Sequence, residues 1–385
     1  MNKVILNRAK RIQEGHLWIF SNELAVSPKN FTPGSIVEVF DKKDNYCGTG
    51  YINPNSLISI RLLSKNRETI DRNFFKTRIE NAFFYRRRVM PDANSFRVVY
   101  SEADSLPGLI IDKFENVLSI QFLTLGMETF KNIILDVLEE IFSPLVIILK
   151  NDASVRELEG LSLEKKVIKG TLDKLPVIDE NGLKFEVNPL EGQKTGYFFD
   201  QRENRKAFTA LANGGKALDL FSYTGAWAVS LAKKVNNVTL VDSSEPALEK
   251  AKVNAKLNGV LEKCEFVKSD VFDFIKNASE FSYEIIVVDP PAFAKNKSNL
   301  KQAIWAYRNL NSRAMRLLKP GGFMAVCSCS HHIKKEVFIE IIRAAAKDTN
   351  MNFKIVELRS QAKDHPSLLS MPETEYLKCL LLTTV

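Results

Sequence analysis

From about residue 190 onward, short apolar runs alternate with segments of helical spacing, and this pattern limits the fold more than any other feature. Five mostly apolar runs stand out, over residues 217–220, 238–241, 264–267, 285–288 and 323–327. Strands of this kind are buried on both faces, as in a parallel sheet that helices cover on each side. We therefore predict an α/β fold, with this sheet in a domain that spans residues 189–385.

The first half of the chain has a different pattern. In residues 1–70, short strand-like runs are separated by turn residues, which is typical of a small β-barrel. In residues 71–188, strands mix with a helix expected over 128–142, and Asn181-Gly182 between two strand-like runs predicts a hairpin. Because 385 residues are too many for one ordinary core, we predict three domains, over 1–70, 71–188 and 189–385.

Charge and cysteine content narrow the class of protein. The net charge is +8, and the excess of Lys and Arg lies in the two end regions, as it does in proteins that grip a polyanion. The five cysteines have neither disulfide nor zinc spacing, so we expect a cytoplasmic protein without a metal. No apolar run reaches 18 residues, and we expect no membrane partner.

Acidic residues follow the first three strands of the predicted sheet. They are Asp219, Asp242 and Asp270, and in an open parallel sheet the ligand lies beyond these strand ends. Asp242 could accept both ribose hydroxyls of a nucleoside, and Asp270 could contact an adenine amino group. The alternative is that these carboxylates only cap helices.

The turn after the first strand indicates which kind of nucleotide cofactor the domain binds. A dehydrogenase needs a G-x-G-x-x-G turn, because a pyrophosphate must approach the backbone closely. Here Gly225 is the single glycine of the turn that follows Asp219. S-adenosylmethionine carries no phosphate, so we predict it as the cofactor.

Two further strand ends carry chemistry. The fourth strand ends in Asp289-Pro290-Pro291, where two prolines hold a carboxylate in a stiff turn suited to a flat ring. The fifth strand leads to Cys327 and Cys329, of which Cys329 is nearer the ligand edge. A Cys329 thiolate could attack carbon 6 of a cytosine and so activate carbon 5 for methylation. Both cysteines could equally be small core residues.

Longer motifs resemble a known family. Residues 192–205 and 218–225, together with 101–109 and 155–161, are similar to the bacterial class I 23S rRNA methyltransferases with an N-terminal PUA domain, especially the cytosine-C5 members. The resemblance implies a PUA-like RNA-binding barrel, a small central α+β domain and a Rossmann-like methyltransferase domain. It implies Cys329 as the nucleophile and Asp289 as a second catalytic residue. The implied cofactor-binding residues are Gln201, Arg202, Asp219, Phe221, Tyr223, Gly225, Asp242, Asp270 and Asp289.

The same resemblance sets expectations for partners and for the reaction. The partner would be RNA, either 23S rRNA or a large-subunit assembly intermediate, with the target base turned out of its helix. Arg86, Arg87 and Arg88 could grip the RNA backbone, although such a run also suits a solvated helix face. Pro291 stands where other RNA cytosine-C5 methyltransferases carry a second cysteine, which leaves the product-release group open. Homodimer formation stays open too.

Three alternatives remain at this point. A guanine methyltransferase on the same scaffold would share the Asp289 turn and would not need Cys329. A non-catalytic RNA-binding assembly factor would bind the cofactor without turnover. A dehydrogenase is disfavoured because the phosphate-binding turn is missing.

Overall fold

Residues 2–294 and 297–385 are described by the computed structural model, and their contacts divide the chain into two units. Unit 1 consists of Met1–Ile178, Val187–Phe199 and Lys363–Thr374. Unit 2 consists of Asp179–Glu186, Asp200–Ala362 and Glu375–Val385. Residues 363–374 thus belong with the N-terminal part of the chain. The finer division into three domains stays a prediction.

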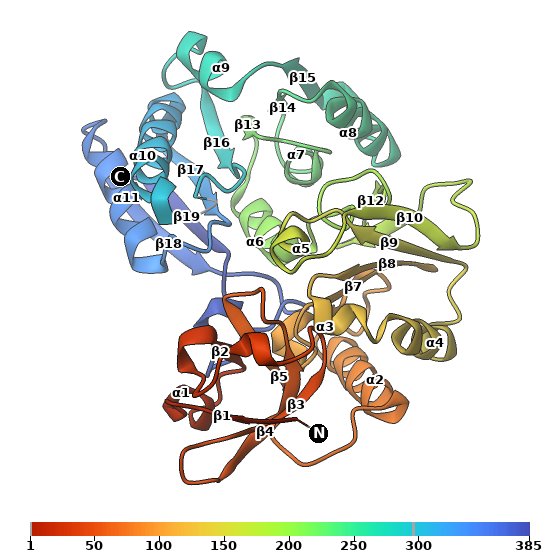
Figure 1. Ribbon diagram of the computed structural model, residues 1–385. Coiled ribbons are helices and arrows are strands. Elements are labelled where there is room, and N and C mark those ends of the chain that lie inside the picture. The colour runs from red at the N-terminus through yellow and green to blue at the C-terminus, as the bar shows by residue number, and fades with distance from the viewer. Residues whose placement is uncertain (1, 295–296) are drawn as a thin grey trace. The chain divides into compact units, whose positions relative to one another are not determined.

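The first sheet of unit 1 has five strands in the order β1-β3-β4-β5-β2 (Figure 1). The strands are β1 (Asn2–Ile5), β2 (Trp18–Phe20), β3 (Ile36–Phe40), β4 (Tyr46–Ile52) and β5 (Ile58–Ser64), with the short helix α1 (Lys10–Gln13) after β1. β1 and β3 are parallel and the other pairs antiparallel. Its core includes Val4, Ile19 and Val37, and also Met371 from the C-terminal region.

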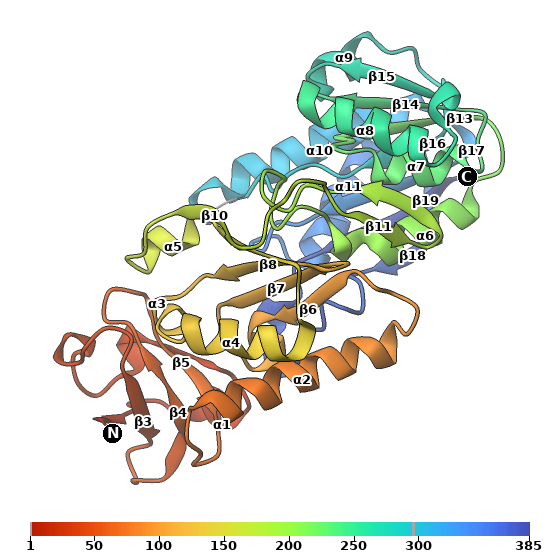
Figure 2. The ribbon, with the colours of Figure 1, turned by 90° about the vertical axis from the view of Figure 1, so that its right-hand side faces the viewer.

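A second five-stranded sheet of unit 1 has the order β10-β9-β8-β7-β6. Its strands are β6 (Phe96–Tyr100), β7 (Leu109–Phe114), β8 (Val117–Phe122), β9 (Val146–Asn151) and β10 (Glu164–Lys169). The helices are α2 (Arg72–Val89), α3 (Leu125–Glu128), α4 (Lys131–Phe142) and α5 (Val155–Leu158). Helices α2 and α4 lie side by side (Figures 1 and 2). The helix predicted over 128–142 corresponds to α4, which begins three residues later than predicted, and Glu128 is instead the last residue of the short helix α3.

The hairpin predicted at Asn181-Gly182 is present. It joins β11 (Val177–Glu180) to β12 (Leu183–Glu186). Both turn residues have positive φ angles, 55° for Asn181 and 81° for Gly182. This is the backbone of a type I′ turn, which Asn-Gly adopts readily because its twist matches that of the strands.

Unit 2 contains a seven-stranded sheet in the order β15-β14-β13-β16-β17-β19-β18. The strands are β13 (Lys216–Leu220), β14 (Asn237–Asp242), β15 (Cys264–Lys268), β16 (Tyr283–Val288), β17 (Leu318–Ser328), β18 (Phe353–Arg359) and β19 (Lys378–Thr384). The pairs from β15 to β17 are parallel, and β19 is antiparallel to both neighbours. The predicted α/β fold is confirmed, and the antiparallel β19 is an addition to the predicted strands.

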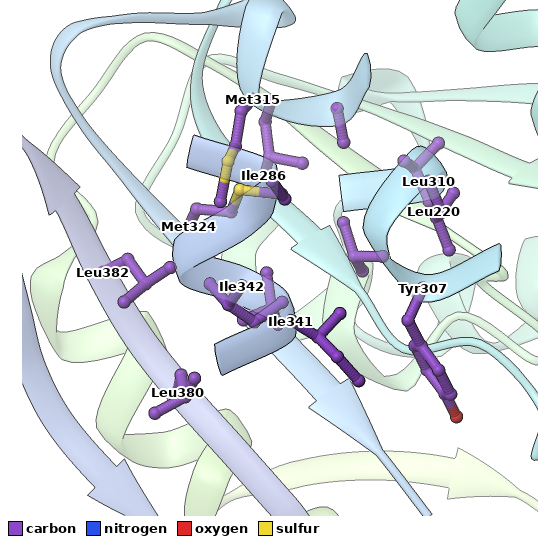
Figure 3. Close-up of a cluster of buried hydrophobic side chains, with 14 of the residues drawn as sticks. Leu220, Ile286, Tyr307, Leu310, Met315, Met324, Ile341, Ile342, Leu380 and Leu382 are labelled. Carbon is purple, nitrogen blue, oxygen red and sulfur yellow. The ribbon is translucent and has the colours of Figure 1, made fainter. Parts of the chain in front are cut away.

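The helices of unit 2 pack in two groups. They are α6 (Arg202–Leu211), α7 (Ala226–Ala232), α8 (Glu245–Leu257), α9 (Val271–Asn277), α10 (Leu300–Leu317) and α11 (Lys335–Lys347). Helix α7 contacts α6 and α8, whereas α10 contacts α9 and α11. Figure 3 shows the apolar cluster that α10 and α11 form with the sheet, including Tyr307, Met324, Ile341 and Leu380.

The strand order places the candidate site. From β13 the chain moves outward to β14 and β15, and it then returns to the other side of β13 as β16. Ligands in open α/β sheets bind at such a reversal, beyond the carboxyl ends of the strands. Within residues 2–294 and 297–385, no helix is long and apolar enough to cross a membrane.

Candidate active site

Asp219 lies on β13 at the strand reversal and is completely buried. Its Oδ2 accepts a hydrogen bond of 3.0 Å from the backbone N–H of Ala228 in α7. Its Oδ1 is buried without a hydrogen-bond partner among the described residues. Burial, and after it the negative charges of Asp289 and Asp242, raise the pKa of Asp219 well above its usual range. A buried carboxylate in this situation is a functional-site candidate.

The turn after β13 has an unusual backbone. Phe221, Tyr223 and Gly225 all have positive φ angles, of 63°, 47° and 79°. For residues with a side chain this conformation costs about 1–2 kcal/mol each. The turn is held in place because the Tyr223 N–H donates to Asp242 Oδ2 at 2.9 Å. Strained, well-fixed backbone is typical of ligand-binding turns.

Gly225 allows the turn to pack closely on α8. It is the N-cap of α7, and a Cβ at this position would lie 3.0 Å from the Cβ of Ala251 in α8. The close approach that this glycine permits in the structure is toward α8, and its close approach to the cofactor stays a prediction.

The two other strand-end carboxylates, Asp242 and Asp270, differ in their burial and in their hydrogen bonds. Asp242 ends β14 and is half-buried, and its Oδ1 accepts the N–H of Ser244 at 2.8 Å. Asp270 is exposed and N-caps α9, accepting from the N–H groups of Phe272 and Asp273. Helix capping, the alternative weighed from the sequence, thus describes Asp270, and its contact with an adenine stays a prediction.

Asp289 follows β16 directly and is held by two side-chain donors. The Nε2 of Gln201 and the Nε1 of Trp227 each donate to Asp289 Oδ2 at 3.0 Å. Gln201 is fixed in turn because its Oε1 accepts from the Nδ2 of Asn204 at 2.7 Å. The structure thus joins Gln201 and Asp289, two of the predicted residues, and adds Trp227 to them.

Arg202 begins α6, next to Gln201, and its side chain is buried. Its Nε lies 3.6 Å from Glu180 Oε2, on the carboxylate that Arg205 binds through two hydrogen bonds of 2.6 and 2.7 Å. This ion pair gives Arg202 a structural role, and a contact with the cofactor stays a prediction.

Asp200 and Glu203 do not form a capping box at the start of α6. The N-cap of α6 is Gln201, without a side-chain cap, because Asp200 lies in the preceding 3₁₀ turn. Asp200 Oδ2 instead accepts from the hydroxyl of Tyr376 at 2.5 Å.

The cysteines at the end of β17 have different surroundings. Cys327 is 1% exposed and stands opposite Cys379 of β19. Burial raises the pKa of the Cys327 thiol well above its usual range, and the neighbouring Cys379 adds to the effect. Cys329 is half-buried and lies just past the last strand residue, Ser328. Cys329 is therefore the more accessible thiol at the ligand edge.

Buried hydroxyl groups fix the backbone around Cys329. The Ser328 hydroxyl donates to the Tyr307 hydroxyl at 3.1 Å, and the Tyr307 and Ser330 hydroxyls are 3.0 Å apart. The Ala294 N–H, in the segment after Asp289, donates to the Ser330 hydroxyl at 3.3 Å. The ends of β16 and β17 are thus connected by hydrogen bonds.

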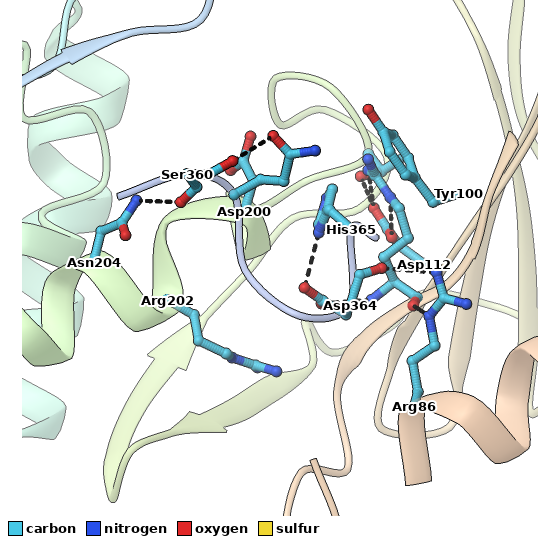
Figure 4. Close-up of polar contacts among 12 residues, drawn as sticks. Arg86, Tyr100, Asp112, Asp200, Arg202, Asn204, Ser360, Asp364 and His365 are labelled. Atoms are coloured by element: carbon cyan, nitrogen blue, oxygen red, sulfur yellow. Dashed lines mark hydrogen bonds and ion pairs between the residues drawn. The ribbon is translucent and has the colours of Figure 1, made fainter. Parts of the chain in front are cut away.

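The arginines proposed to bind RNA separate into two kinds. Arg86 is completely buried in unit 1, where it pairs with Asp104 and donates to the backbone oxygens of Arg97 and Asp364 (Figure 4). A side chain so enclosed cannot reach RNA, so that part of the prediction is wrong for Arg86. Arg87 and Arg88 are exposed, and their RNA contact stays a prediction.

His365 lies in the same unit as Arg86. It is buried, with its Nδ1 2.8 Å from Asp364 Oδ1 and its ring against Tyr100 (Figure 4). This environment is that of a structural residue.

The strand-end carboxylates favour a cationic ligand. Asp219, Asp242 and Asp289 are close enough for the second and third to raise the pKa of the first. A bound positive charge would relieve this repulsion. The buried Ser222 hydroxyl, in the strained turn, also has no hydrogen-bond partner among the described residues. These groups suit a nucleoside that carries a sulfonium.

Comparison with known proteins identifies the family. Residues 4–65 match a PUA-like domain, and residues 165–381 match the S-adenosylmethionine-dependent methyltransferases. The chain belongs to the S-adenosylmethionine-dependent methyltransferase family. Among the relatives of this methyltransferase is "Ribosomal RNA large subunit methyltransferase I" of Pseudoalteromonas translucida, 37% identical over 97% of this chain and 96% of that one. The Klebsiella pneumoniae protein of the same name is 36% identical over 96% and 95%.

Solved structures agree on the fold of the methyltransferase. SMU.776, described as a candidate methyltransferase in complex with SAH, has a TM-score of 0.87, and each chain is covered completely. At 20% identity this likeness supports the fold alone. The predicted PUA-like and Rossmann-like domains are confirmed.

S-adenosylmethionine is therefore the cofactor of this methyltransferase. The residues available to hold it are those of the strained turn and the carboxylates of Asp219 and Asp242. Sequence reasoning missed Trp227 and Ser222 in this neighbourhood. A tryptophan on a helix next to the turn was a usable signal, because a buried indole N–H needs an acceptor. Nothing in the sequence distinguished Ser222.

Proposed function

We propose that the protein transfers a methyl group to carbon 5 of a cytosine in 23S rRNA through a covalent adduct with Cys329. The full-length relatives named for ribosomal RNA methylation support the substrate class. The observation that carries the cytosine assignment is the half-buried thiol of Cys329 at the ligand edge, one strand from Asp289.

The chemistry explains why a nucleophile is needed. Carbon 5 of a cytosine is too weak a nucleophile to take a methyl group directly. A bond from Cys329 Sγ to carbon 6 moves an electron pair toward carbon 5, which then bonds to the methyl carbon. S-adenosylmethionine supplies that methyl group from a sulfonium, which leaves as a neutral thioether. Loss of the carbon 5 proton and cleavage of the S–C6 bond restore the thiolate and the aromatic ring.

Asp289 positions the base in this proposal. Its Oδ2 is fixed by Gln201 and Trp227, so the carboxylate is pre-oriented before a base arrives. A carboxyl group fixed in this way suits the N3 and N4 edge of cytosine. The proline pair that follows keeps the turn stiff.

The N-terminal PUA-like domain and the exposed Arg87 and Arg88 supply RNA affinity through backbone charge and shape. The target base leaves its helix to reach Cys329. The reaction takes place in the cytoplasm, on rRNA or on an assembling large subunit.

The test is nucleoside mass spectrometry of unmodified 23S rRNA after incubation with the protein and S-adenosylmethionine. Cys329→Ala is compared with Cys327→Ala, which removes a thiol two residues away that is buried and 1% exposed. We expect 5-methylcytidine from the wild type and from the Cys327 variant, and none from the Cys329 variant.

Other products would decide between the alternatives. Methylguanosine from all three proteins would replace the cytosine mechanism with a guanine methyltransferase. If no product forms on naked rRNA, the same three proteins are tested on immature large subunits. Cofactor binding without any product there would support a non-catalytic assembly factor.

A further inference from the structure

Lys378 is a buried lysine next to the proposed nucleophile. It is the first residue of β19 and is 5% exposed. In the antiparallel pair of β17 and β19 it stands opposite Ser328, the residue before Cys329. Its Nζ donates to the backbone oxygen of Ser330, the residue after Cys329, at 2.7 Å. Lys378 therefore pairs with the residue before Cys329 and donates a hydrogen bond to the residue after it.

The charge of Lys378 is poorly compensated. Its second hydrogen bond, also 2.7 Å, goes to the backbone oxygen of Tyr376, so both of these acceptors are neutral. Among the described residues, no carboxylate lies within 4.0 Å of its Nζ. A buried ammonium normally has an anionic partner, because desolvation of an isolated charge is costly.

The groups around this pair come from several elements. Tyr307 of α10 faces Cys329, and burial raises the pKa of Tyr307 to about 12, so its hydroxyl stays neutral. His331 is exposed and stacks on Tyr376. The negative charge of Glu375 acts on Lys378, and Asp289 follows the neighbouring strand β16. Lys378 is the buried cation of this set.

Resting on the proposed function, we propose that the Lys378 ammonium is the counterion that holds Cys329 as a thiolate, and that Lys378 is thus a positioning residue for the methyl transfer. A thiolate beside a cation forms at lower pH than a free thiol, which is the state that attacks carbon 6.

The electrostatics agree with this geometry. Burial lowers the pKa of Lys378 to about 8, and the negative charges of Cys329 and, after it, Glu375 act in the opposite direction. Because the charge interaction with Cys329 acts on both groups, the Lys378 ammonium favours the ionised form of the Cys329 thiol. The lysine is mostly charged at pH 7 and loses its proton as the pH rises through about 8. The counterion is therefore present at neutral pH.

The test measures the reactivity of Cys329 without RNA or cofactor. The protein is alkylated with iodoacetamide from pH 5.5 to 9.5, and each cysteine is quantified by peptide mass spectrometry. Cys264 serves as an internal reference in the same digest, because burial raises its pKa to about 11. We expect Cys329 to react at lower pH than it does in the urea-unfolded protein.

Lys378→Gln removes the charge and keeps a hydrogen-bond donor for Ser330. We expect alkylation of Cys329 at pH 7 to slow about tenfold, which corresponds to a shift of one pH unit in the midpoint. Lys378→Arg retains the charge and is expected to recover part of the rate. Lys354→Gln, an exposed lysine on β18, is the matched control and is expected to leave the rate unchanged.

Two outcomes overturn the proposal. One is a wild-type Cys329 that titrates like the unfolded thiol, a result that requires no variant to fold. The other is an unchanged midpoint in a folded Lys378→Gln protein. If the midpoint moves but Cys329→Ala still makes 5-methylcytidine, the ion pair stands and the proposed nucleophile is wrong. In the Lys378→Gln variant, the acidic limb of the pH profile of kcat/KM is expected to move to higher pH.

Discussion

At the scale of single residues, Asp219 combines two properties that ordinary structural carboxylates lack. It is completely buried, and one of its oxygens has no hydrogen-bond partner among the described residues. Its pKa is raised by burial and by Asp289 and Asp242. An ionised Asp219 therefore destabilises the fold in the absence of a cationic ligand, and the binding of that ligand offsets the cost.

We predict that Asp219→Asn is more stable than the wild type at neutral pH and binds S-adenosylmethionine roughly 10–100-fold more weakly, as expected for loss of a charged hydrogen-bonding group. Because the folded state holds the Asp219 proton more tightly than the unfolded state, wild-type stability falls as the pH rises above the ordinary value of 3.8. The stability difference between the proteins should thus grow from pH 4 to 8. Thermal unfolding and calorimetric titration measure the two effects.

Asp136→Asn is the control for this comparison, since Asp136 is exposed on α4. This substitution makes the same chemical change away from the site, and neither the stability of the protein nor its affinity for S-adenosylmethionine should change. An Asp219→Asn protein that is less stable at every pH would contradict the assignment of strain to this carboxylate.

The three consecutive arginines near the end of α2, Arg86 to Arg88, give a second prediction at this scale. Arg86→Gln leaves Asp104 and two backbone oxygens without their buried donor, so we expect a loss of about 3–5 kcal/mol in the free energy of unfolding. Replacing exposed Arg87 and Arg88 together by Gln should change stability by less than about 1 kcal/mol. If they contact phosphates, RNA affinity and its salt dependence should both decrease. Chemical denaturation and filter binding at several salt concentrations separate these effects.

These residues show how much of the candidate site could be predicted from the sequence. Positions of chemically special type, such as Asp219, Asp289 and Cys329, were found because strand ends have a known place in a parallel sheet. Trp227 and Lys378 were not found, because their importance comes from contacts with residues 62 and 48 positions away. Arg86 was misassigned because a charged residue on a polar helix normally faces water.

At the scale of elements, the turn between β13 and α7 is strained. Its three positive φ angles are maintained by hydrogen bonds to β14 and by the close contact of Gly225 with α8. We predict that Gly225→Ala lowers the free energy of unfolding by about 1–3 kcal/mol, from the φ strain and the contact together. Cofactor affinity should fall as well. Thermal unfolding with and without S-adenosylmethionine provides the measurement.

Gly259→Ala separates the two causes. Gly259 also has a positive φ angle, 64°, but a Cβ there would meet nothing within 4 Å. It should therefore show the strain alone and leave cofactor binding intact. Equal effects of both substitutions would mean that the contact of Gly225 with Ala251 is unimportant.

The elements themselves were predictable to different degrees. Apolar runs predicted the start of β15 at the observed residue, and they predicted the starts of β13, β14, β16 and β17 within five residues of the observed ones. β18 was missed because its side chains are mostly exposed, so it lacks an apolar run. β19 contains such a run, Cys379–Leu382, and could have been predicted. The antiparallel direction of β19 depends on sheet pairing, which local pattern does not specify.

At the scale of the whole molecule, each unit contains chain segments that are distant in sequence. Met371 is completely buried in the core of the first sheet, with Val4 and Ile19. We predict that Met371→Ala lowers the stability of unit 1 by about 2–5 kcal/mol. Hydrogen exchange should then increase in β1 to β5, more than 300 positions away in the sequence.

The neighbouring Leu369 provides the control, because its side chain is fully exposed. Leu369→Ala is expected to change stability by less than about 0.5 kcal/mol. Faster exchange confined to the residues next to position 371 would contradict a contribution to the N-terminal core.

The membership of residues 363–374 in unit 1 has a consequence for how the protein is made. Domains usually fold as they leave the ribosome, N-terminal parts first. Here the core around β1 lacks Met371, and Arg86 lacks its acceptor at Asp364, until the chain has been synthesised past residue 371. A nascent chain stalled before that point carries an N-terminal sheet with an open core, so unit 1 should complete its fold only after most of unit 2 has been synthesised.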